Sequence, residues 1–309
     1  MNCIDFFCGA GVGAIGFKQA GFEIIDAVDN NPHAIRTYNL NIGNHARALD
    51  VRKIKEDIDY ADLYIGGIPC QPFSIGGSQR GFTDEKHGDL GYQFLRIVAN
   101  KQPKVFLMEN VKGMVFKKYE VFINWLLDNI NDIGYHADLK LIDAFDYGVP
   151  QNRERVFIIG VRKDLKGSFR FPEPTEERRV LKDALQGLPE VNSQSGIRNH
   201  NQYYDGGYSS RYISRNRQRQ WHEPSYTIVS QARQLPLYPE PPNYDIRRMD
   251  EYSCEPPRRF TVRECLRIQT VPDWFYFPDD IPLLKQYERC SGIPTLLAYK
   301  IGKEIEKLL

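Results

Sequence analysis

A single cysteine stands directly after an apolar run in the segment LYIGGIPCQPFS, residues 63–74. Cys70 lies between Pro69 and Gln71, Pro72 follows, and two glycines precede it. A cysteine attacks only as the thiolate, and it must be presented from rigid backbone. The two prolines stiffen the chain on both sides of the thiol. We therefore interpret Cys70 as a candidate nucleophile, with a buried structural thiol as the alternative.

A carboxylate and two arginines adjoin other apolar runs. Glu109 lies near the end of VFLMENV, and Arg153 and Arg155 precede the apolar centre of RVFIIGVR. Ligands of open parallel sheets bind at the carboxyl ends of the strands, so Cys70, Glu109 and Asp29 are expected at one edge. Two arginines in alternate positions of an extended chain are expected to project from the same side. They would steady a thiolate or hold a carbonyl oxygen, and surface solvation is the alternative.

A glycine-rich turn follows the first apolar run. Gly11, Gly13 and Gly16 have the spacing G-x-G-x-x-G, which lets the backbone approach a ligand at a helix N-terminus. Asp29 ends the next apolar run, where a carboxylate can accept bonds from both ribose hydroxyls. Asp50 is a candidate for the adenine amino group, or a plain loop carboxylate. The pattern indicates an adenosine cofactor and does not separate a nicotinamide dinucleotide from S-adenosylmethionine.

Alternating strand and helix patterns are expected to position these groups. A helix is predicted from Pro32, with Asn31 as its cap, and another over PTLLAYKIGKEIEKLL at the end of the sequence. The alternation predicts an α/β fold with a doubly wound, mostly parallel sheet. The predicted strands lie in the segments CIDFF, EIIDAVD, DLYIGG, KVFLMEN and RVFIIGVR, and a further strand is expected at RALDV, ending at Asp50.

The second half of the sequence has a different character. From about residue 171 it is rich in proline, glycine and polar residues, without long helical periodicity. We expect a catalytic and cofactor-binding domain over 1–180, completed by a helix within 283–309, and a smaller loop-rich domain over 181–282. The segment from Arg198 to Arg233 holds six arginines against two acids, interleaved with tyrosines. Such a segment is typical of a nucleic-acid face, with a solvated surface as the alternative.

Composition narrows the class of protein. The 309 residues carry a net charge of +1 and are 41% hydrophobic, which fits a globular protein with a sizeable core. We expect a cytoplasmic protein, because no apolar stretch approaches the ~18 residues that span a bilayer and the opening lacks a charged leader. Six cysteines without a Cys-x-x-Cys pair predict neither disulfides nor a metal site.

Five motifs in order resemble those of the DNA (cytosine-5)-methyltransferases, from the N-terminus to the final helix. They are DFFCGAG, GGIPCQPFSIGG, MENVKGM, QNRERVF and RFTVRECLRIQ. The segment YISRNRQRQWHEPSYTIVSQARQ is similar to bacterial restriction-modification enzymes of the HaeIII type, which methylate the inner cytosine of GGCC. The resemblance implies a Rossmann-like methyltransferase fold with a target-recognition domain.

The resemblance also implies a mechanism. The Cys70 thiolate adds to carbon 6 of cytosine, and Glu109 bonds ring nitrogen 3 and the amino group. Arg153 holds the carbonyl oxygen, with Arg155 as support. The base must be flipped out of the duplex to be reached. The glycine-rich loop of residues 74–82 would close over it.

Binding roles follow from the same resemblance. Arg215, Arg217 and Arg233 match positions that contact guanines, where a guanidinium fork fits two acceptors. Arg211 and Arg219 would serve as phosphate contacts. The implied partners are double-stranded DNA and a cognate restriction endonuclease, and a monomer is expected. The cofactor would be S-adenosylmethionine, held by Phe7, Gly9, Gly11, Asp29, Asp50 and Pro69.

Two departures from the family pattern leave alternatives open. Residues 291–294 read Ser-Gly-Ile-Pro where family members have Gly-Asn-(Ser or Ala)-Val-Pro, and Ile68 replaces a common proline. A DNA-binding protein with weakened catalysis is therefore one alternative. The others are a nicotinamide-dependent oxidoreductase and a transfer-RNA cytosine methyltransferase, whose usual Cys-Phe-Thr signature is absent. The arginines of RRFTVREC, residues 258–265, are expected to be structural.

Overall fold

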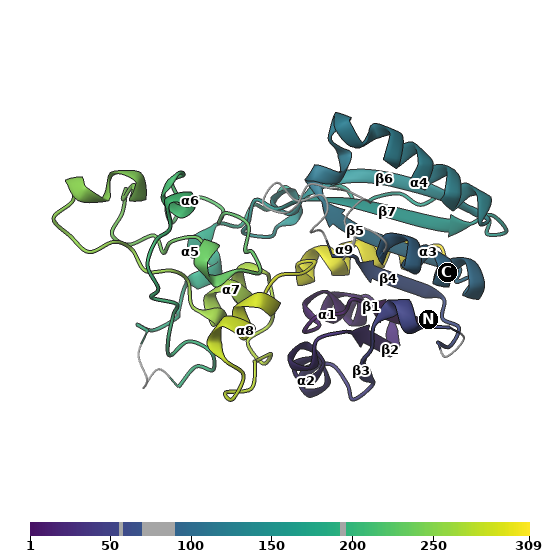
Figure 1. Cartoon of the computed structure of the whole chain (residues 1–309), viewed down its shortest axis with the longest axis horizontal. Coiled ribbons are helices and arrows are strands. Elements are labelled where there is room, and N and C mark those ends of the chain that lie inside the picture. Colours follow the sequence, from purple (N-terminus) through teal and green to yellow (C-terminus); the bar gives the residue numbers. More distant parts are fainter. Residues whose placement is uncertain (56–57, 70–89, 192–195) are drawn as a thin grey trace. The chain divides into compact units, whose positions relative to one another are not determined.

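The computed structural model describes residues 1–55, 58–69, 90–191 and 196–309. Its centre is a seven-stranded sheet in the order β3-β2-β1-β4-β5-β7-β6 (Figure 1). All neighbouring strands pair in parallel except β7, which is antiparallel to β5 and to β6. The predicted fold class, a mostly parallel α/β sheet, is confirmed. The strands are β1 (Asn2–Phe6), β2 (Glu23–Asp29), β3 (Ala46–Ala48), β4 (Leu63–Gly67), β5 (Val105–Val111), β6 (Tyr135–Asp143) and β7 (Glu154–Arg162).

Helices connect the parallel strands. The cap of α2 is confirmed, because Asn31 Oδ1 accepts a bond from Ala34 N at 3.0 Å. The strand expected in RALDV, residues 47–51, is found as the shorter β3, which ends two residues before Asp50. The strand β6 was not predicted, because it mixes charged with apolar residues. The helices along the sheet are α1 (Val12–Gln19), α2 (Pro32–Asn41), α3 (Leu90–Lys101) and α4 (Glu120–Asp132), with the 3₁₀ turns η1 (Val51–Lys53), η3 (Lys112–Val115) and η4 (Lys117–Tyr119).

The sheet buries both of its faces. On one face, Phe6, Tyr64 and Phe106 belong to a core that includes residues of α3 and α4. Alternate strand residues such as Leu107 and Phe157 are also completely buried. Burial on both faces explains why the central strands read as continuous apolar runs rather than as alternating ones.

The final helix packs against α1. A Cβ at Gly302, within α9 (Thr295–Glu306), would lie 2.8 Å from Ala20 Cβ and 3.2 Å from the Phe17 ring. The glycine therefore permits close contact between the two helices. The helix predicted at the end of the sequence is confirmed, and Figure 1 shows it in yellow.

The chain forms two compact units. The first consists of Met1–Asp143, Glu154–Glu173 and Ala298–Leu309, and the second of Ala144–Arg153 and Pro174–Leu297. The functional division into 1–180 with 283–309 and 181–282 stays a prediction. The elements of the second unit are short, namely α5 (Leu181–Leu185), α6 (Ser210–Ile213), α7 (Val262–Ile268) and α8 (Leu283–Arg289), with the 3₁₀ turns η5 (Ala144–Tyr147), η6 (Ala232–Gln234) and η7 (Ile246–Glu251).

Arginine–tyrosine contacts take the place of a large apolar core in part of the second unit. The Arg259 guanidinium lies over the rings of Tyr208 and Tyr212, 4.5 and 4.8 Å from their centres, and donates to Gly206 O at 2.8 Å. Arg258 forms a bidentate pair with Glu264, at 2.8 and 2.7 Å. These arginines have partners inside the unit, as a structural role requires.

Among the described residues, no helix has the length and apolarity to span a bilayer.

Candidate functional site

Four parallel strands bring predicted site residues to one edge of the sheet. Register pairs Phe6 with Val28 and with Gly66, and Gly67 with Glu109, so the strand ends are level. Phe7 follows β1, and Glu109 lies two residues before the end of β5. Asp29 is the last residue of β2, and Pro69 comes two residues after β4. The parallel edge thus gathers groups from four strands, and the edge predicted to be shared by Asp29 and Glu109 is confirmed for these two residues.

Glu109 and Arg155 form an ion pair at this edge. Glu109 lies opposite Phe157 of β7, and Arg155, two residues earlier, shares the same face of the strand. Arg155 Nε lies 3.0 Å from Glu109 Oε1, and the side chains are only 15% and 12% exposed. The antiparallel direction of β7 is what brings its beginning to the carboxyl ends of the parallel strands. The pair offers an acceptor and a donor side by side.

Arg153 belongs to the second unit and is almost completely buried there. Its Nη1 donates to Ile228 O at 3.1 Å, and its Nη2 lies 3.5 Å from Ser291 Oγ. Ser291 begins the segment that departs from the family pattern. Its hydroxyl therefore gives the altered segment a contact with one of the predicted catalytic arginines.

Two buried glutamines, which the sequence analysis missed, support the same segment. Gln151 Oε1 accepts from Ile228 N at 2.8 Å, and Gln151 Nε2 donates to Gln269 Oε1 at 2.7 Å. Gln269 Nε2 then donates to Cys290 O at 3.0 Å. A backbone donor at one end and a backbone acceptor at the other fix the direction of both side-chain amides. Their signal in the sequence is weak: Gln151 is the first residue of the motif QNRERVF, and Gln269 is the last residue of RFTVRECLRIQ.

The glycine turn after β1 is built from left-handed residues. Phe7 and Gly9 have φ of 58° and 55°, and Gly11, the N-cap of α1, has φ of 92°. A Cβ at Gly11 would lie 2.7 Å from Ile42 Cγ1, whereas one at Gly9 would have nothing within 4 Å. Gly11 is thus required by packing against the chain after α2. Gly9 borders open space, as a close approach of a ligand requires.

Asp29 anchors this turn. Its Oδ2 accepts from Gly9 N at 3.0 Å, and its Oδ1 accepts from Asn31 N at 2.8 Å. A carboxylate has about four acceptor positions, so each oxygen can still take a hydroxyl. The turn and Asp29 therefore fit the ribose and the adjoining atoms of an adenosine cofactor. This fit depends on the acceptor capacity of Asp29 and on the space at Gly9.

Asp50 follows β3 and is partly exposed. Its Oδ1 accepts from Arg52 N at 3.0 Å, and its Oδ2 lies 3.2 Å from Arg52 Nη1. The carboxylate caps η1 and also retains acceptor capacity for an amino group. Both readings of Asp50 from the sequence, local cap and ligand contact, are compatible with these bonds.

Asp5 is a buried carboxyl that the sequence analysis did not single out. Burial and, second, the charge of Asp29 raise the pKa of Asp5 to about 8. Asp5 is therefore mostly protonated at neutral pH, which lets it lie inside the sheet beside a cofactor turn. Its signal in the sequence is one acidic residue within the apolar segment CIDFF.

The described cysteines differ sharply in environment. Burial raises the pKa of the Cys3, Cys8 and Cys265 thiols well above the ordinary value, and that of Cys290 is raised as well. Such thiols stay protonated and are poor nucleophiles. Cys254 is exposed. Cys70 and the predicted closing loop of residues 74–82 lie outside the described residues.

The predicted DNA-reading arginines lie in the second unit and differ in exposure. Arg215 and Arg233 are exposed, whereas Arg217 is half-buried and bonded to the protein. Arg219 pairs with Glu223 at 2.8 Å and stacks over the Tyr226 ring. Arg217 is therefore fixed by bonds within the protein, whereas Arg215 and Arg233 are exposed at the surface.

The sequence matches the C-5 cytosine-specific DNA methylase family over residues 1–307. It is 38% identical to the Type II methyltransferase M.FnuDI of Fusobacterium nucleatum, over all of this chain and 95% of the relative. Identity to the Type II methyltransferase M.MthTI of Methanothermobacter thermautotrophicus is 37%, over 99% of this chain and 97% of the relative. These matches span both compact units.

Solved structures agree with this assignment. A protein described as a "putative DNA modification methyltransferase" encoded within an E. coli prophage matches 100% of this chain and 99% of its own, with a TM-score of 0.73 and 26% sequence identity. The S. pombe Dnmt2 methyltransferase has a TM-score of 0.67 at 18% identity, which shows a shared fold. A nicotinamide-dependent oxidoreductase is not supported by any of these matches. The chain belongs to the C-5 cytosine-specific DNA methylase family and is a DNA cytosine methyltransferase of the Type II restriction-modification kind.

Proposed function

We propose that this enzyme methylates carbon 5 of a flipped-out cytosine in duplex DNA through a temporary covalent bond to Cys70. The thiolate bonds carbon 6, which makes carbon 5 nucleophilic enough to accept a methyl group. The carbon 5 proton then leaves and the carbon–sulfur bond breaks, which returns the thiolate. Glu109 would bond ring nitrogen 3 and the amino group during the step, and Arg153 the carbonyl oxygen.

The observation that carries this proposal is the Glu109–Arg155 pair at the carboxyl edge. Both side chains are mostly buried, and the contact with Arg155 holds the Glu109 carboxylate in one orientation. Gly67, paired with Glu109, ends the strand that precedes Cys70 by three residues in the sequence. The buried cysteines among the described residues, Cys3, Cys8, Cys265 and Cys290, are protonated. The candidates for the nucleophile are therefore Cys70, which follows β4 in the sequence, and the exposed Cys254 of the second unit.

A trapping experiment tests the nucleophile. A duplex with 5-fluorocytosine at the target position cannot lose a proton from carbon 5, so the covalent bond persists. The wild-type enzyme should form a denaturant-resistant adduct whose crosslinked peptide contains Cys70, and Cys70→Ala should form none. Cys254→Ala is the matched control and should trap DNA like the wild type. An adduct at another side chain would disprove the proposed chemistry.

S-adenosylmethionine is the proposed methyl donor. Phe7, Gly9, Asp29 and Asp50 would hold its adenosine, with Gly11 shaping the turn and Pro69 beside it. Isothermal titration with S-adenosylhomocysteine should give binding that Asp29→Ala weakens by at least tenfold, because ribose acceptors are removed. The conservative variant Asp29→Glu separates loss of the acceptors from collapse of the turn.

The proposed target is the inner cytosine of GGCC. The support is the similarity of residues 212–234 to the HaeIII-type enzymes, in which positions matching Arg215, Arg217 and Arg233 contact guanines. Base-resolution mapping of methylated cytosines in unmethylated bacterial DNA tests this directly. Methylation confined to GGCC is expected, and another motif would overturn the target while leaving the chemistry in place. Transfer RNA incubated in parallel should remain unmethylated, which tests the alternative substrate. The proposed cognate endonuclease would cleave the same sequence, and sedimentation should give a monomer.

A further inference from the structure

Arg217 is held rigidly by its own unit. Its Nε donates to Tyr212 O at 3.3 Å, and its Nη2 donates to Gln234 Oε1 at 3.2 Å. Its guanidinium lies 5.0 Å from the centre of the Tyr212 ring. The backbone is held as well, because Leu237 N donates to Arg217 O at 2.9 Å. Both ends of the residue are thus tied to the segment from Gln234 to Leu237.

These bonds occupy one particular edge of the guanidinium. Nε and Nη2 form the side edge of the planar fork, and the protein uses both of them. The end edge, formed by Nη1 and the second hydrogen of Nη2, has no bond in the described part of the chain. Five N–H donors in a rigid plane cannot change edges without breaking the existing bonds. The end edge is therefore presented in a fixed direction.

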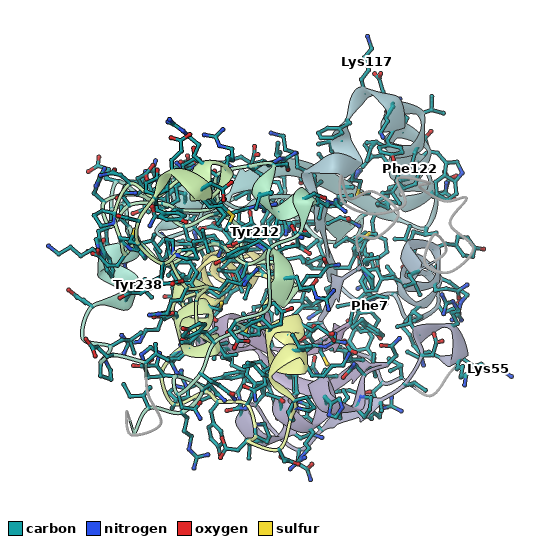
Figure 2. All side chains as sticks on the ribbon, turned by 60° about the vertical axis from the view of Figure 1, so that its left-hand side comes forward. Phe7, Lys55, Lys117, Phe122, Tyr212 and Tyr238 are labelled. Carbon is teal, nitrogen blue, oxygen red and sulfur yellow. The ribbon has the colours of Figure 1, made fainter. Side chains whose placement is uncertain are left out.

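The surroundings of Gln234 give it this role. Gln234 is the last residue of η6, directly after the exposed Arg233. The same turn therefore holds Arg233, one candidate for reading DNA, and Gln234, which bonds another candidate, Arg217. Tyr212 is completely buried, and its hydroxyl donates to Leu235 O at 2.7 Å. Figure 2 labels Tyr212 among the side chains of this unit. Burial, and second the nearby cations Arg215 and Arg211, lower the pKa of Arg217. These three arginines form a cluster of positive charge, which favours an electron-rich partner.

We infer that Gln234 is a specificity-determining positioning residue, which with Tyr212 aims the end edge of Arg217 at the two acceptors of a guanine. This inference depends on the proposed reading of guanine by Arg217. A fork fixed before binding loses less conformational freedom on contact with DNA, and it penalises any base that does not present two acceptors. Arg215 and Arg233, which lack such clamps among the described residues, would discriminate less strongly.

The test measures discrimination rather than activity. The ratio of kcat/KM between the target duplex mapped for the wild type and duplexes with one base pair changed is determined for each variant. Arg217→Ala should lower this ratio at one guanine position by at least tenfold, and Gln234→Met should lower it about tenfold at the same position. Gln234→Glu keeps the acceptor and should retain the wild-type ratio, although added negative charge weakens DNA binding. Gln231→Met, in the same turn and without contact to Arg217, is the matched control.

The outcomes separate the two claims. If Arg217→Ala leaves discrimination unchanged, the base-reading role proposed for Arg217 is wrong. If Arg217→Ala lowers it and Gln234→Met does not, the role of Gln234 is wrong and the base-reading role stands. An equal loss in Gln231→Met would also overturn the inference, since general damage to the turn would then explain it. Unfolding temperatures and S-adenosylhomocysteine binding near wild-type values establish that each variant is folded.

Discussion

Asp5 and Asp29 are two carboxyl groups near the glycine turn, and their surroundings differ. Asp29 accepts two backbone N–H bonds, which hold its carboxylate in place beside the glycine turn. Asp5 lies inside the sheet, where burial favours its neutral form. A second negative charge next to Asp29 would be costly in this interior. Protonation of Asp5 is thus part of how the turn tolerates Asp29.

The raised pKa of Asp5 predicts a pH dependence of stability. The folded pKa of about 8 exceeds the unfolded value near 3.9, so the stabilisation is complete below the unfolded value and is lost as pH rises toward 8. Asp5→Asn mimics the neutral form. The free energy of unfolding of the wild type should fall relative to Asp5→Asn between about pH 5 and about pH 8, by at most about 1.4 kcal/mol per pH unit.

Urea unfolding at several pH values measures this difference. Asp128→Asn, at an exposed position of α4, is the control and should show no such trend against the wild type. A difference between Asp5→Asn and the wild type that is constant over this range would mean that Asp5 does not titrate there.

At the scale of elements, the glycines before α1 serve different purposes. Gly9 and Gly11 both have a left-handed φ, but of these two positions only Gly11 is one where an added Cβ would collide with a neighbouring side chain. Ile42, which it would meet, follows α2. The G-x-G-x-x-G motif therefore provides close packing between the start of α1 and the end of α2, as well as the space at Gly9 that is proposed for the cofactor.

Gly11→Ala and Gly9→Ala separate these purposes. Left-handed strain costs each variant about 1–2 kcal/mol, and Gly11→Ala adds the clash with Ile42. Gly11→Ala should therefore lower the free energy of unfolding more than Gly9→Ala does, without any cofactor present. Gly9→Ala should instead weaken S-adenosylhomocysteine binding more strongly. Denaturant unfolding and calorimetric titration provide the two measurements, and equal effects in both would contradict the division.

At the scale of the whole molecule, the net charge is small, but positive charge is concentrated in one part of the chain. The net charge is only +1, yet Arg211, Arg215 and Arg233 are all exposed in the second unit. Neutralised phosphates release counterions, so DNA affinity depends on these local cations and not on the net charge. The second unit is therefore expected to supply most of the electrostatic attraction.

Salt dependence tests the distribution of charge. The slope of log K against log salt concentration should become shallower by about one in Arg211→Gln, with the methylated motif unchanged. Lys117→Gln is the control, because Lys117 projects outward from the first unit (Figure 2). Fluorescence anisotropy with a target duplex gives both slopes. Equal changes in the two variants would show that the attraction is spread over the molecule.

Most of the first unit could be predicted from the amino-acid sequence. Continuous apolar runs identified five strands, and Asn31 with Pro32 identified the start of α2. Local rules suffice here, because strands buried on both faces and capped helices leave short-range patterns. The edge shared by Phe7, Asp29 and Glu109 follows from parallel strand direction alone.

Long-range contacts were decided only by the tertiary structure. The antiparallel direction of β7 brings Arg155 to Glu109, although 46 residues separate them in the sequence. The clamp of Gln234 on Arg217 and the amide pair of Gln151 and Gln269 likewise join distant segments. No local pattern marks these pairs, because each side chain alone is an ordinary polar residue. Only folding, which buries them together, requires every donor to meet an acceptor.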